Sequence, residues 1–265
     1  MAPRRVRFAA MVATLIGVGL LSQIPSSAQP VTSPHLEFGQ PGGDCTLLDK
    51  RVFVVCYDED RRIPAWVAYR LKASDLTGAV DRTDDFRADE ALDDEARSEP
   101  RDYEHSGYDQ GHMAPAEDFT RSERAMSTTF LLSNMTPQRP ALNRGKWKAL
   151  EGQIRKLAGE VQAVWIITGS LFTTPRPAHH RQTIGRGRVA VPTDFFKVIL
   201  ARDSDGEFTT YGFIMPNSMN PLKGKAADFE QTVNEAERLS GLNFFDALDD
   251  AMEERLESAL EEWPF

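Results

Sequence analysis

Three polar residues in the middle of the chain, His112, Asn143 and Glu151, have side chains that could share acid–base and metal chemistry. His112 follows a glycine in a polar turn, and a neutral imidazole can take a proton from water near pH 7. Asn143 opens a helical pattern that carries Glu151 two turns later, and amide and carboxylate oxygens are hard ligands suited to Mg²⁺. A base beside a metal ion is the minimum set of groups for splitting a phosphodiester with water.

Three short motifs carry these residues, and they follow one another in a fixed order. Residues 109–112 read DQGH, residues 133–138 read SNMTPQ, and residues 142–151 read LNRGKWKALE. They resemble the patterns DRGH, SNxxPQ and LNxxxWxxLE of the DNA/RNA non-specific endonucleases, a family of the ββα-metal (His-Me finger) superfamily. Three spaced motifs in the right order are a specific signal, whereas DxGH alone would be weak.

The likeness extends beyond these motifs. Residues 81–89 resemble an upstream DRxxxFxxD pattern of the family, and residues 189–200 and 212–217 resemble its later strands. The similarity runs from about residue 57 to about residue 245. The resemblance therefore implies the family fold, a central sheet with helices on both faces, over most of the chain.

The resemblance also implies roles for the residues of the predicted site. His112 is the catalytic base, which activates water for in-line attack on phosphorus and does not bind the metal. Asn143 holds a single Mg²⁺, with Mn²⁺ as the alternative, and the remaining ligands are mostly water. Glu151 hydrogen-bonds to that water, and Arg82 contacts the scissile phosphate.

Arg155, Gln110 and Arg87 are the predicted substrate-binding residues. Arg155 lies one turn beyond Glu151, where it could stabilise the phosphate or simply pair with Glu151. Gln110 stands where the family has an arginine, so it keeps hydrogen bonding and lacks the positive charge. Arg87 comes from the charged, loop-rich segment 80–107. The missing arginine leaves the rate, the affinity and the substrate class open.

Structural explanations compete with these functional ones. A histidine such as His112, taken alone, is more often a loop residue held by backbone hydrogen bonds. Asn143 is a favoured N-cap for the predicted helix 143–159, and a cap and a metal ligand are compatible. His179 and His180 form a pair that invites a metal site, but no carboxylate or cysteine stands near them in the sequence.

Hydrophobic patterning predicts strands and helices without regular βαβ alternation. Strands are expected at 52–57, 64–71, 129–132, 163–172, 188–202 and 207–217. Helices are expected at 143–159, at 228–241 with a glycine stop, and at 244–260. This order favours an α+β fold with a central antiparallel sheet flanked by helices. The ββα-metal motif of the resembled family would lie at the site.

The N-terminal segment predicts export. Residues 1–28 combine basic residues, an apolar stretch and a small-residue cleavage site, as in a signal peptide, and an uncleaved anchor is the alternative. Residues 29–50 are expected to form an N-terminal lead. Residues 51–265 are expected to form a single nuclease domain with an acidic C-terminal helix. The mature protein would then be periplasmic or extracellular.

Cys45 and Cys56 are the only cysteines of the chain. An even pair in an exported protein favours one disulfide, here a short bridge closing a hairpin at the strand 52–57. The spacing fits no zinc motif. Two free buried thiols are the alternative.

The acidic composition limits how the protein meets nucleic acid. The formal charge is −9, and loss of the three arginines of the leader lowers it to −12. Such a charge argues against a protein that coats nucleic acid through a global positive field. It does not exclude a nuclease, because catalysis needs only a local basic cleft.

These observations together predict an exported, metal-dependent, sugar-non-specific endonuclease. It would contact the backbones of DNA and RNA, release 5′-phosphate products and have no membrane contact after cleavage of the leader. A phosphodiesterase for small diesters or nucleotides and a non-catalytic nucleic-acid-binding relative are the alternatives. A homodimer is left open beside a monomer.

Overall fold

The computed structural model of the protein describes residues 33–173 and 182–265. The predicted signal peptide and the pair His179 and His180 lie outside these residues. Within them, the strands form one main sheet and two small two-stranded sheets. In the small sheets, β4 (Asp109–His112) pairs with β5 (Met135–Gln138), and β7 (Thr183–Ile184) pairs with β8 (Val189–Ala190).

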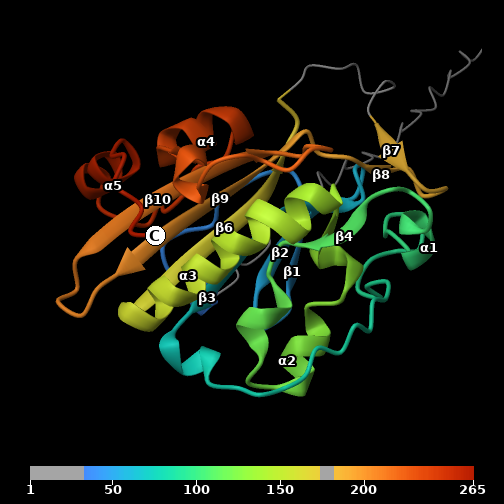
Figure 1. Cartoon of the computed structure of the whole chain (residues 1–265), viewed down its shortest axis with the longest axis horizontal. Helices are drawn as coiled ribbons and strands as arrows, with labels where there is room; N and C mark the ends of the chain where they lie inside the picture. Colours follow the sequence, from blue (N-terminus) through green and yellow to red (C-terminus); the bar gives the residue numbers. More distant parts are fainter. Residues whose placement is uncertain (1–32, 174–181) are drawn as a thin grey trace, which may run out of the picture. The chain divides into compact units, whose positions relative to one another are not determined.

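The main sheet of the described part of the chain has seven antiparallel strands in the order β1-β2-β3-β6-β9-β10-β11 (Figure 1). They are β1 (Thr46–Asp49), β2 (Val54–Asp58), β3 (Ile63–Leu71), β6 (Ala163–Leu171), β9 (Asp194–Arg202), β10 (Phe208–Pro216) and β11 (Glu230–Gln231). The central strands are buried almost throughout, because both faces of the sheet are covered. The strands predicted at 52–57, 64–71, 163–172 and 207–217 are confirmed, and so is the α+β fold class.

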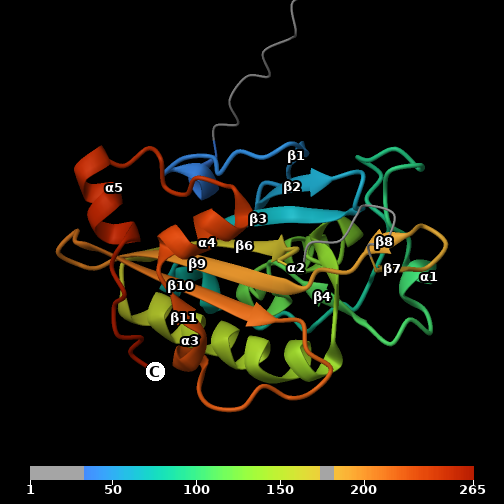
Figure 2. The same cartoon turned by 90° about the horizontal axis from the view of Figure 1, so that it is seen from above.

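Helices cover the two faces of the sheet separately, with α3 on one side and α4 and α5 on the other (Figure 2). The helices of the described residues, besides short 3₁₀ and π-helical turns, are α1 (Pro100–Tyr103), α2 (Glu123–Thr128), α3 (Lys148–Glu160), α4 (Val233–Ser240) and α5 (Asp250–Glu257). Ile199 of β9 packs in the core under α3, whereas its neighbour Val198 packs in the core under α4. Alternate residues of one strand therefore serve two separate cores.

The C-terminal helices are shorter than predicted. α4 begins after Thr232, whose side chain caps it, and it ends at Gly241, which has a left-handed φ of 72° and confirms the predicted glycine stop. α5 begins only after Asp249, which caps it by accepting from the Ala251 N–H at 3.2 Å. None of the helices in the described ranges has the length and apolar character needed to cross a membrane.

The strand predicted at 129–132 is wrong. These residues follow α2 through a turn, Leu131 forms only an isolated bridge to Arg87, and the strand β5 starts at Met135. The buried side chain of Asn134 stabilises this turn, because its Nδ2 donates to the carbonyl oxygens of Thr129 and Ala114 at 2.9 and 3.0 Å. Hydrogen bonds from a polar side chain to backbone carbonyls thus take the place of the backbone hydrogen bonds that a β-strand would make.

The single strand predicted over 188–202 is divided in the structure. Its first part is the two-residue strand β8, and its second part is β9, which begins at Asp194. Pro192 stands between them and has no N–H to donate to a ladder. The chain therefore changes partner there, and the Thr193 N–H donates to the Leu171 carbonyl at 2.9 Å.

Residues 33–49 belong to the folded domain rather than to a separate N-terminal lead. Trp165 donates its Nε1 proton to the Pro34 carbonyl at 3.1 Å. His35 accepts a hydrogen bond from the Arg70 N–H of β3 at 3.0 Å. β1 then pairs along its whole length with β2. The lead predicted for residues 29–50 is thus wrong over the part that the structure describes.

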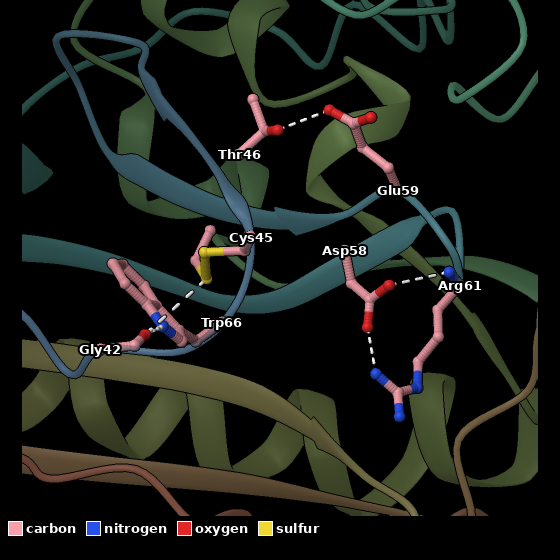
Figure 3. Close-up of a disulfide and its surroundings, with 8 residues drawn as sticks. Gly42, Cys45, Thr46, Asp58, Glu59, Arg61 and Trp66 are labelled. Carbon is pink, nitrogen blue, oxygen red and sulfur yellow. Dashed lines mark hydrogen bonds and ion pairs between the residues drawn. A yellow bond between two sulfur atoms is a disulfide. The ribbon is translucent and has the colours of Figure 1, made fainter. Parts of the chain in front are cut away.

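A disulfide joins Cys45 to Cys56 and confirms the predicted pairing (Figure 3). Cys45 directly precedes β1, Cys56 lies in β2, and their Cα atoms are 5.4 Å apart. Beside them Trp66 of β3 donates its indole proton to the Gly42 carbonyl at 2.8 Å. The covalent bond and the indole together fix the entry of the chain into the edge of the sheet.

Removal of this disulfide should destabilise the domain without changing its fold. The two cysteines are 11 residues apart. Closing so short a loop corresponds to about 2–3 kcal/mol of unfolding free energy. Urea denaturation of Cys45→Ala/Cys56→Ala, beside the oxidised and the reduced wild type, measures the loss. A double variant as stable as the oxidised protein would show that the bond does not stabilise the fold.

Candidate active site

The three sequence motifs meet in the β4–β5 pair and the helical segment that follows it. His112 lies opposite Met135 in this antiparallel pair. After β5 a π-helical turn, Leu142–Trp147, leads into α3 and completes a ββα arrangement. Gly111 is required where the two strands approach, because a Cβ atom there would lie 2.2 Å from Gln138 Oε1.

His112 is buried at the end of β4, with only 8 % of its surface exposed. The rings of Phe130 and Phe86 meet it edge-on, with centroids 4.9 and 5.8 Å from that of the imidazole. Its Nε2 atom has no hydrogen-bond partner among the described residues. Burial, with a smaller contribution from the charge of Arg82, lowers the pKa of His112 to about 3. The imidazole is therefore neutral at neutral pH and has an unengaged ring nitrogen.

A polar cavity of about 680 Å³ lies beside His112. The structure brings together five of the predicted site residues along its wall, namely Arg82, Gln110, His112, Asn143 and Glu151. Five further charged residues also line it, namely Glu104, Asp109, Glu117, Arg144 and Lys148. Both signs of charge therefore face the cavity.

Asn143 lies inside the helical segment rather than at its start, so the predicted N-cap role is wrong. Its backbone N–H already donates to the Arg139 carbonyl at 2.9 Å. Its side-chain Nδ2 donates to Asp109 Oδ2, also at 2.9 Å. This hydrogen bond fixes the amide and leaves Oδ1, the atom that could bind a metal, without a partner among the described residues.

Asp109 holds Asn143 and Arg144 together. Besides the amide of Asn143, its carboxylate accepts the Nε and Nη2 protons of Arg144 at 2.8 and 2.6 Å. This is a bidentate pair, the geometry that best fixes a guanidinium on a carboxylate. Gln110, the next residue after Asp109, carries no charge, and Arg144 supplies a positive charge to the same cavity.

Glu151 lines the cavity from the first turn of α3 and is almost fully buried. Burial raises the pKa of Glu151 to about 8, and the charges of Lys197 and Arg155 oppose that rise. Near it the buried Asp118 accepts hydrogen bonds from Tyr69 Oη at 2.8 Å and from Arg155 Nη1 at 2.9 Å. A group of buried charges therefore adjoins the cavity.

Arg82 lies at the cavity wall as predicted for a phosphate contact. Its guanidinium carbon is 4.8 Å from the centre of the Phe130 ring, which also packs against His112. Its Nε donates to Asp84 at 2.6 Å. The remaining guanidinium nitrogens have no hydrogen-bond partner among the described residues and can meet an anion in the cavity.

Arg87 and Arg155 do not line the cavity. Arg87 donates through Nη1 to Asp85 Oδ2 at 2.6 Å and to the Ser127 carbonyl at 3.0 Å, which ties its loop to α2. Arg155 pairs with Asp118 rather than with Glu151. For both residues these contacts favour a structural role over the predicted contact with substrate.

The donor atoms around the cavity fit a hydrated magnesium ion better than a closed metal cage. Among the described residues no group of three or more His, Cys, Asp or Glu side chains could hold a metal by itself. The cavity instead offers the free Oδ1 of Asn143 and the carboxylate of Glu151. Mg²⁺ commonly keeps several waters and takes one or two protein oxygens, so this small set of donors is sufficient.

Sequence reasoning missed two cations that the structure brings to the site. Arg144 directly follows the predicted metal ligand in the sequence. Its positive charge comes near Gln110 only because β4 and the helical segment pack together. Lys197 is fully buried in the middle of β9. A lysine inside the apolar run FFKVIL interrupts the pattern of a buried strand, and that interruption is the signal that could have identified it.

Comparison with known proteins agrees with this geometry. The family model described as DNA/RNA non-specific endonuclease matches residues 31–251. Nuclease C1 of Cunninghamella echinulata var. echinulata is 38% identical over 228 residues, which cover 83% of this chain and 90% of that protein. Human mitochondrial endonuclease G is 36% identical over 214 residues, which cover 78% and 72% of the two chains.

A further relative matches nearly the whole chain, and a solved structure matches most of it. A nuclease of Nostoc sp. is 30% identical over 273 residues, which cover 96% of each protein. A crystal structure of EndoG in complex with EndoGI, described as showing the mechanism of EndoG inhibition, superposes with a TM-score of 0.76 at 33% identity. The match covers 81% of this chain and 91% of that one. With its ββα site and these matches, the chain belongs to the DNA/RNA non-specific endonucleases, a family of metal-dependent nucleases.

Proposed function

We propose that this enzyme hydrolyses the phosphodiester bonds of DNA and RNA in the cavity beside His112, with His112 as general base and Mg²⁺ held at Asn143. The observation that carries the proposal is the neutral imidazole of His112, which lines the cavity and whose ring nitrogens have no hydrogen-bond partner among the described residues. A general base needs a lone pair that no other group occupies, and it must be unprotonated before the reaction. His112 meets both conditions.

The surroundings of His112 favour a base rather than a metal ligand. Phe130 and Phe86 pack against the ring at steep angles, and its nitrogens have no hydrogen-bond partner among the described residues. The imidazole takes a proton from water as the water attacks phosphorus, and it carries positive charge only during the reaction. The low pKa means that the imidazolium returns its proton readily.

Asn143 and Glu151 are the residues that would hold and surround the metal. The Asp109 hydrogen bond to Nδ2 aims the amide so that Oδ1 is the free atom. Glu151 would accept hydrogen bonds from the water around the ion. When bound, Mg²⁺ neutralises charge on the five-coordinate phosphorus and on the departing oxygen. Mn²⁺ has similar ligand preferences and is the alternative metal.

Arg82 and Arg144 are the cations best placed to hold the phosphate. Arg82 faces the cavity beside the aromatic pair, and Arg144 is fixed by Asp109. Gln110 can add a hydrogen bond but no charge. Contacts of this type read the backbone rather than the bases, so sequence preference is slight. Departure of the 3′ oxygen gives products with 5′-phosphates.

Export is proposed from the N-terminal segment and from the Cys45–Cys56 disulfide. A disulfide is typical of a protein that folds outside the reducing cytoplasm. Relatives described as mitochondrial nucleases also match this chain, so the family is used in more than one compartment. We propose a periplasmic or extracellular enzyme that acts as a monomer or as a homodimer.

Loss of the base or of the metal ligand should strongly slow cleavage. His112→Ala should lower kcat on plasmid DNA and on RNA by roughly 10²- to 10⁴-fold, the usual contribution of a general base. Asn143→Ala should lower it comparably and raise the Mg²⁺ concentration needed for half-maximal activity. Gel assays with Mg²⁺, Mn²⁺ or EDTA measure both effects.

An exposed residue away from the cavity provides the control for these variants. Asn220→Ala changes the same residue type in an exposed loop and should keep full activity. Metal-dependent cleavage by His112→Ala at the wild-type rate would refute the assignment of the base. A wild type that hydrolyses an aryl phosphodiester but no polymer would point to small diesters as the substrates.

The phosphate-binding role of Arg144 predicts a change mainly in KM. Arg144→Gln should raise KM for DNA about tenfold. It should also reduce the slope of log KM against log salt concentration by about one, because one phosphate contact is lost. Arg124→Gln removes the same charge from the exposed surface of α2 and serves as the matched control. Equal effects of the two variants would mean that Arg144 acts only through net charge.

Acid should destabilise the wild type more than a variant without His112. The unfolded imidazole binds a proton below about pH 6.5, whereas the folded one remains neutral down to about pH 3. Unfolding therefore takes up a proton between these values, and the wild type loses roughly 1.4 kcal/mol per pH unit relative to His112→Phe. Urea denaturation of both proteins at several pH values measures the difference, and parallel curves would contradict it.

A further inference from the structure

The cavity beside His112 is larger than the proposed reaction requires. Its volume of about 680 Å³ is typical of sites that enclose a small organic ligand, whereas one phosphate group fills only a small part of such a space. The wall also includes Pro100, Tyr103, Glu104 and Tyr108, which come from α1 and from the segment between α1 and β4. These four residues, here called the α1 wall, have no role in the proposed chemistry.

The α1 wall is suited to a flat, uncharged group rather than to a second phosphate. None of its residues is a cation, and Glu104 is an exposed carboxylate that repels anions. The proline and the two tyrosines present apolar and aromatic surface to the cavity. In a strand of nucleic acid, the groups near a phosphate that fit such a surface are the bases.

Tyr108 is the aromatic ring of the α1 wall that is accessible for stacking. Tyr103 is only 6 % exposed. Phe86, elsewhere on the cavity wall, is engaged by the rings of Phe130 and His112, whose centroids lie 4.9 and 5.8 Å from its own. Tyr108 is half-buried, and no other aromatic ring of the described residues pairs with it.

Arg139 and Gln182 hold the Tyr108 ring in place. The guanidinium carbon of Arg139 lies 3.9 Å from the centre of the ring, so the cation covers one face. Arg139 does not line the cavity and forms no ion pair with a described carboxylate. Gln182 Nε2 donates to the Tyr108 hydroxyl at 2.7 Å. A ring that is fixed before binding loses little conformational entropy when a ligand stacks on it.

Arg139 also joins this ring to the predicted metal site. Its N–H donates to Asn217 Oδ1 at 2.7 Å, and its carbonyl accepts the Asn143 N–H at 2.9 Å. Tyr108 directly precedes Asp109, whose carboxylate accepts a hydrogen bond from the Asn143 amide. The ring and the predicted metal ligand are therefore held in a fixed relation from both sides.

We propose that Tyr108 binds substrate by stacking the face of its ring opposite Arg139 on a nucleobase next to the scissile phosphate. Every base has a flat π face, so stacking tolerates any sequence and accepts both DNA and RNA. The identity of the ligand rests on the proposed function, but binding of a nucleotide does not require cleavage. The base site and the reaction can therefore be tested separately.

Two probes that differ by the presence of a base test the proposal without catalysis. Thymidine 5′-monophosphate has a base, and 2-deoxyribose 5-phosphate does not. In NMR titrations with Mg²⁺, the wild type should bind the nucleotide at least about fivefold more tightly, because stacking of one base contributes at least this much. The ring current of Tyr108 should also move the thymine protons upfield. Equal affinities of the wild type for the two probes would overturn the proposal.

Substitution of Tyr108 assigns the effect to this ring. Tyr108→Leu should lose both the affinity ratio and the upfield shift, whereas Tyr108→Phe and Tyr108→Trp keep a ring and should keep both. Tyr211→Leu makes the same substitution at a half-buried tyrosine of β10 that does not line the cavity, and it should change neither. An unchanged ratio in Tyr108→Leu would overturn the proposal.

The kinetics of the same variants distinguish substrate binding from a structural role. Tyr108→Leu should raise KM for DNA and for RNA at least about fivefold, with kcat within about twofold of the wild type. Urea denaturation of each variant reports whether the fold is intact. A loss of kcat with an unchanged KM would show that Tyr108 supports the site rather than the substrate, and would overturn the stacking role.

Failure of this proposal and failure of the proposed function are distinguishable. A wild type that binds the nucleotide through its base but cleaves no polymer would refute the proposed function and support the base site. A wild type that cleaves DNA and RNA but binds both probes equally would support the proposed function and overturn the base site. The comparison of the two probes on the wild type does not depend on how any variant folds.

Discussion

Burial of one neutral imidazole is the constraint around which the site is organised. His112 ends a short strand, is covered by Phe130 and Phe86, and has a free Nε2. An unpaired buried nitrogen is unfavourable for stability, and proteins retain such groups where they serve a function. The close approach of Gly111 to Gln138 in the β4–β5 pair fixes the ring at the cavity wall.

Neighbouring residues of the fold position and compensate the charged groups that line the cavity beside His112. Asp109 joins the amide of Asn143 to the guanidinium of Arg144, so the metal-binding oxygen and a phosphate-binding cation are set by one carboxylate. Burial raises the pKa of Glu151 at the same cavity, and the charges of Lys197 in β9 and Arg155 in α3 oppose that rise. The sheet therefore contributes to the electrostatics of the site as well as to its position.

Local motifs predicted the family, the fold class and five residues of the cavity wall. In DQGH and LNRGKWKALE the functional side chains and the residues that shape the backbone around them lie within a few positions of one another. Long apolar runs likewise predicted the central strands. The strand predicted at 129–132 was wrong because the buried amide of Asn134 stabilises a turn there, and a pattern of apolar residues does not reveal such a hydrogen bond. The N-cap assigned to Asn143 was wrong because helical backbone begins before it. Arg144 gains its place at the cavity from packing between distant segments, which the linear sequence does not display.

The protonation state of His112 is the quantity on which the account depends most. Nitrogen-15 NMR of histidine-labelled, metal-free protein, with His112→Gln to assign the signal, reports it directly across about pH 4 to 8. We predict a neutral imidazole throughout this range, with one protonated and one unprotonated ring nitrogen. A signal that titrates near the ordinary histidine value of about 6.5 would contradict the account, because the ring would then be solvated or paired rather than held as a free base.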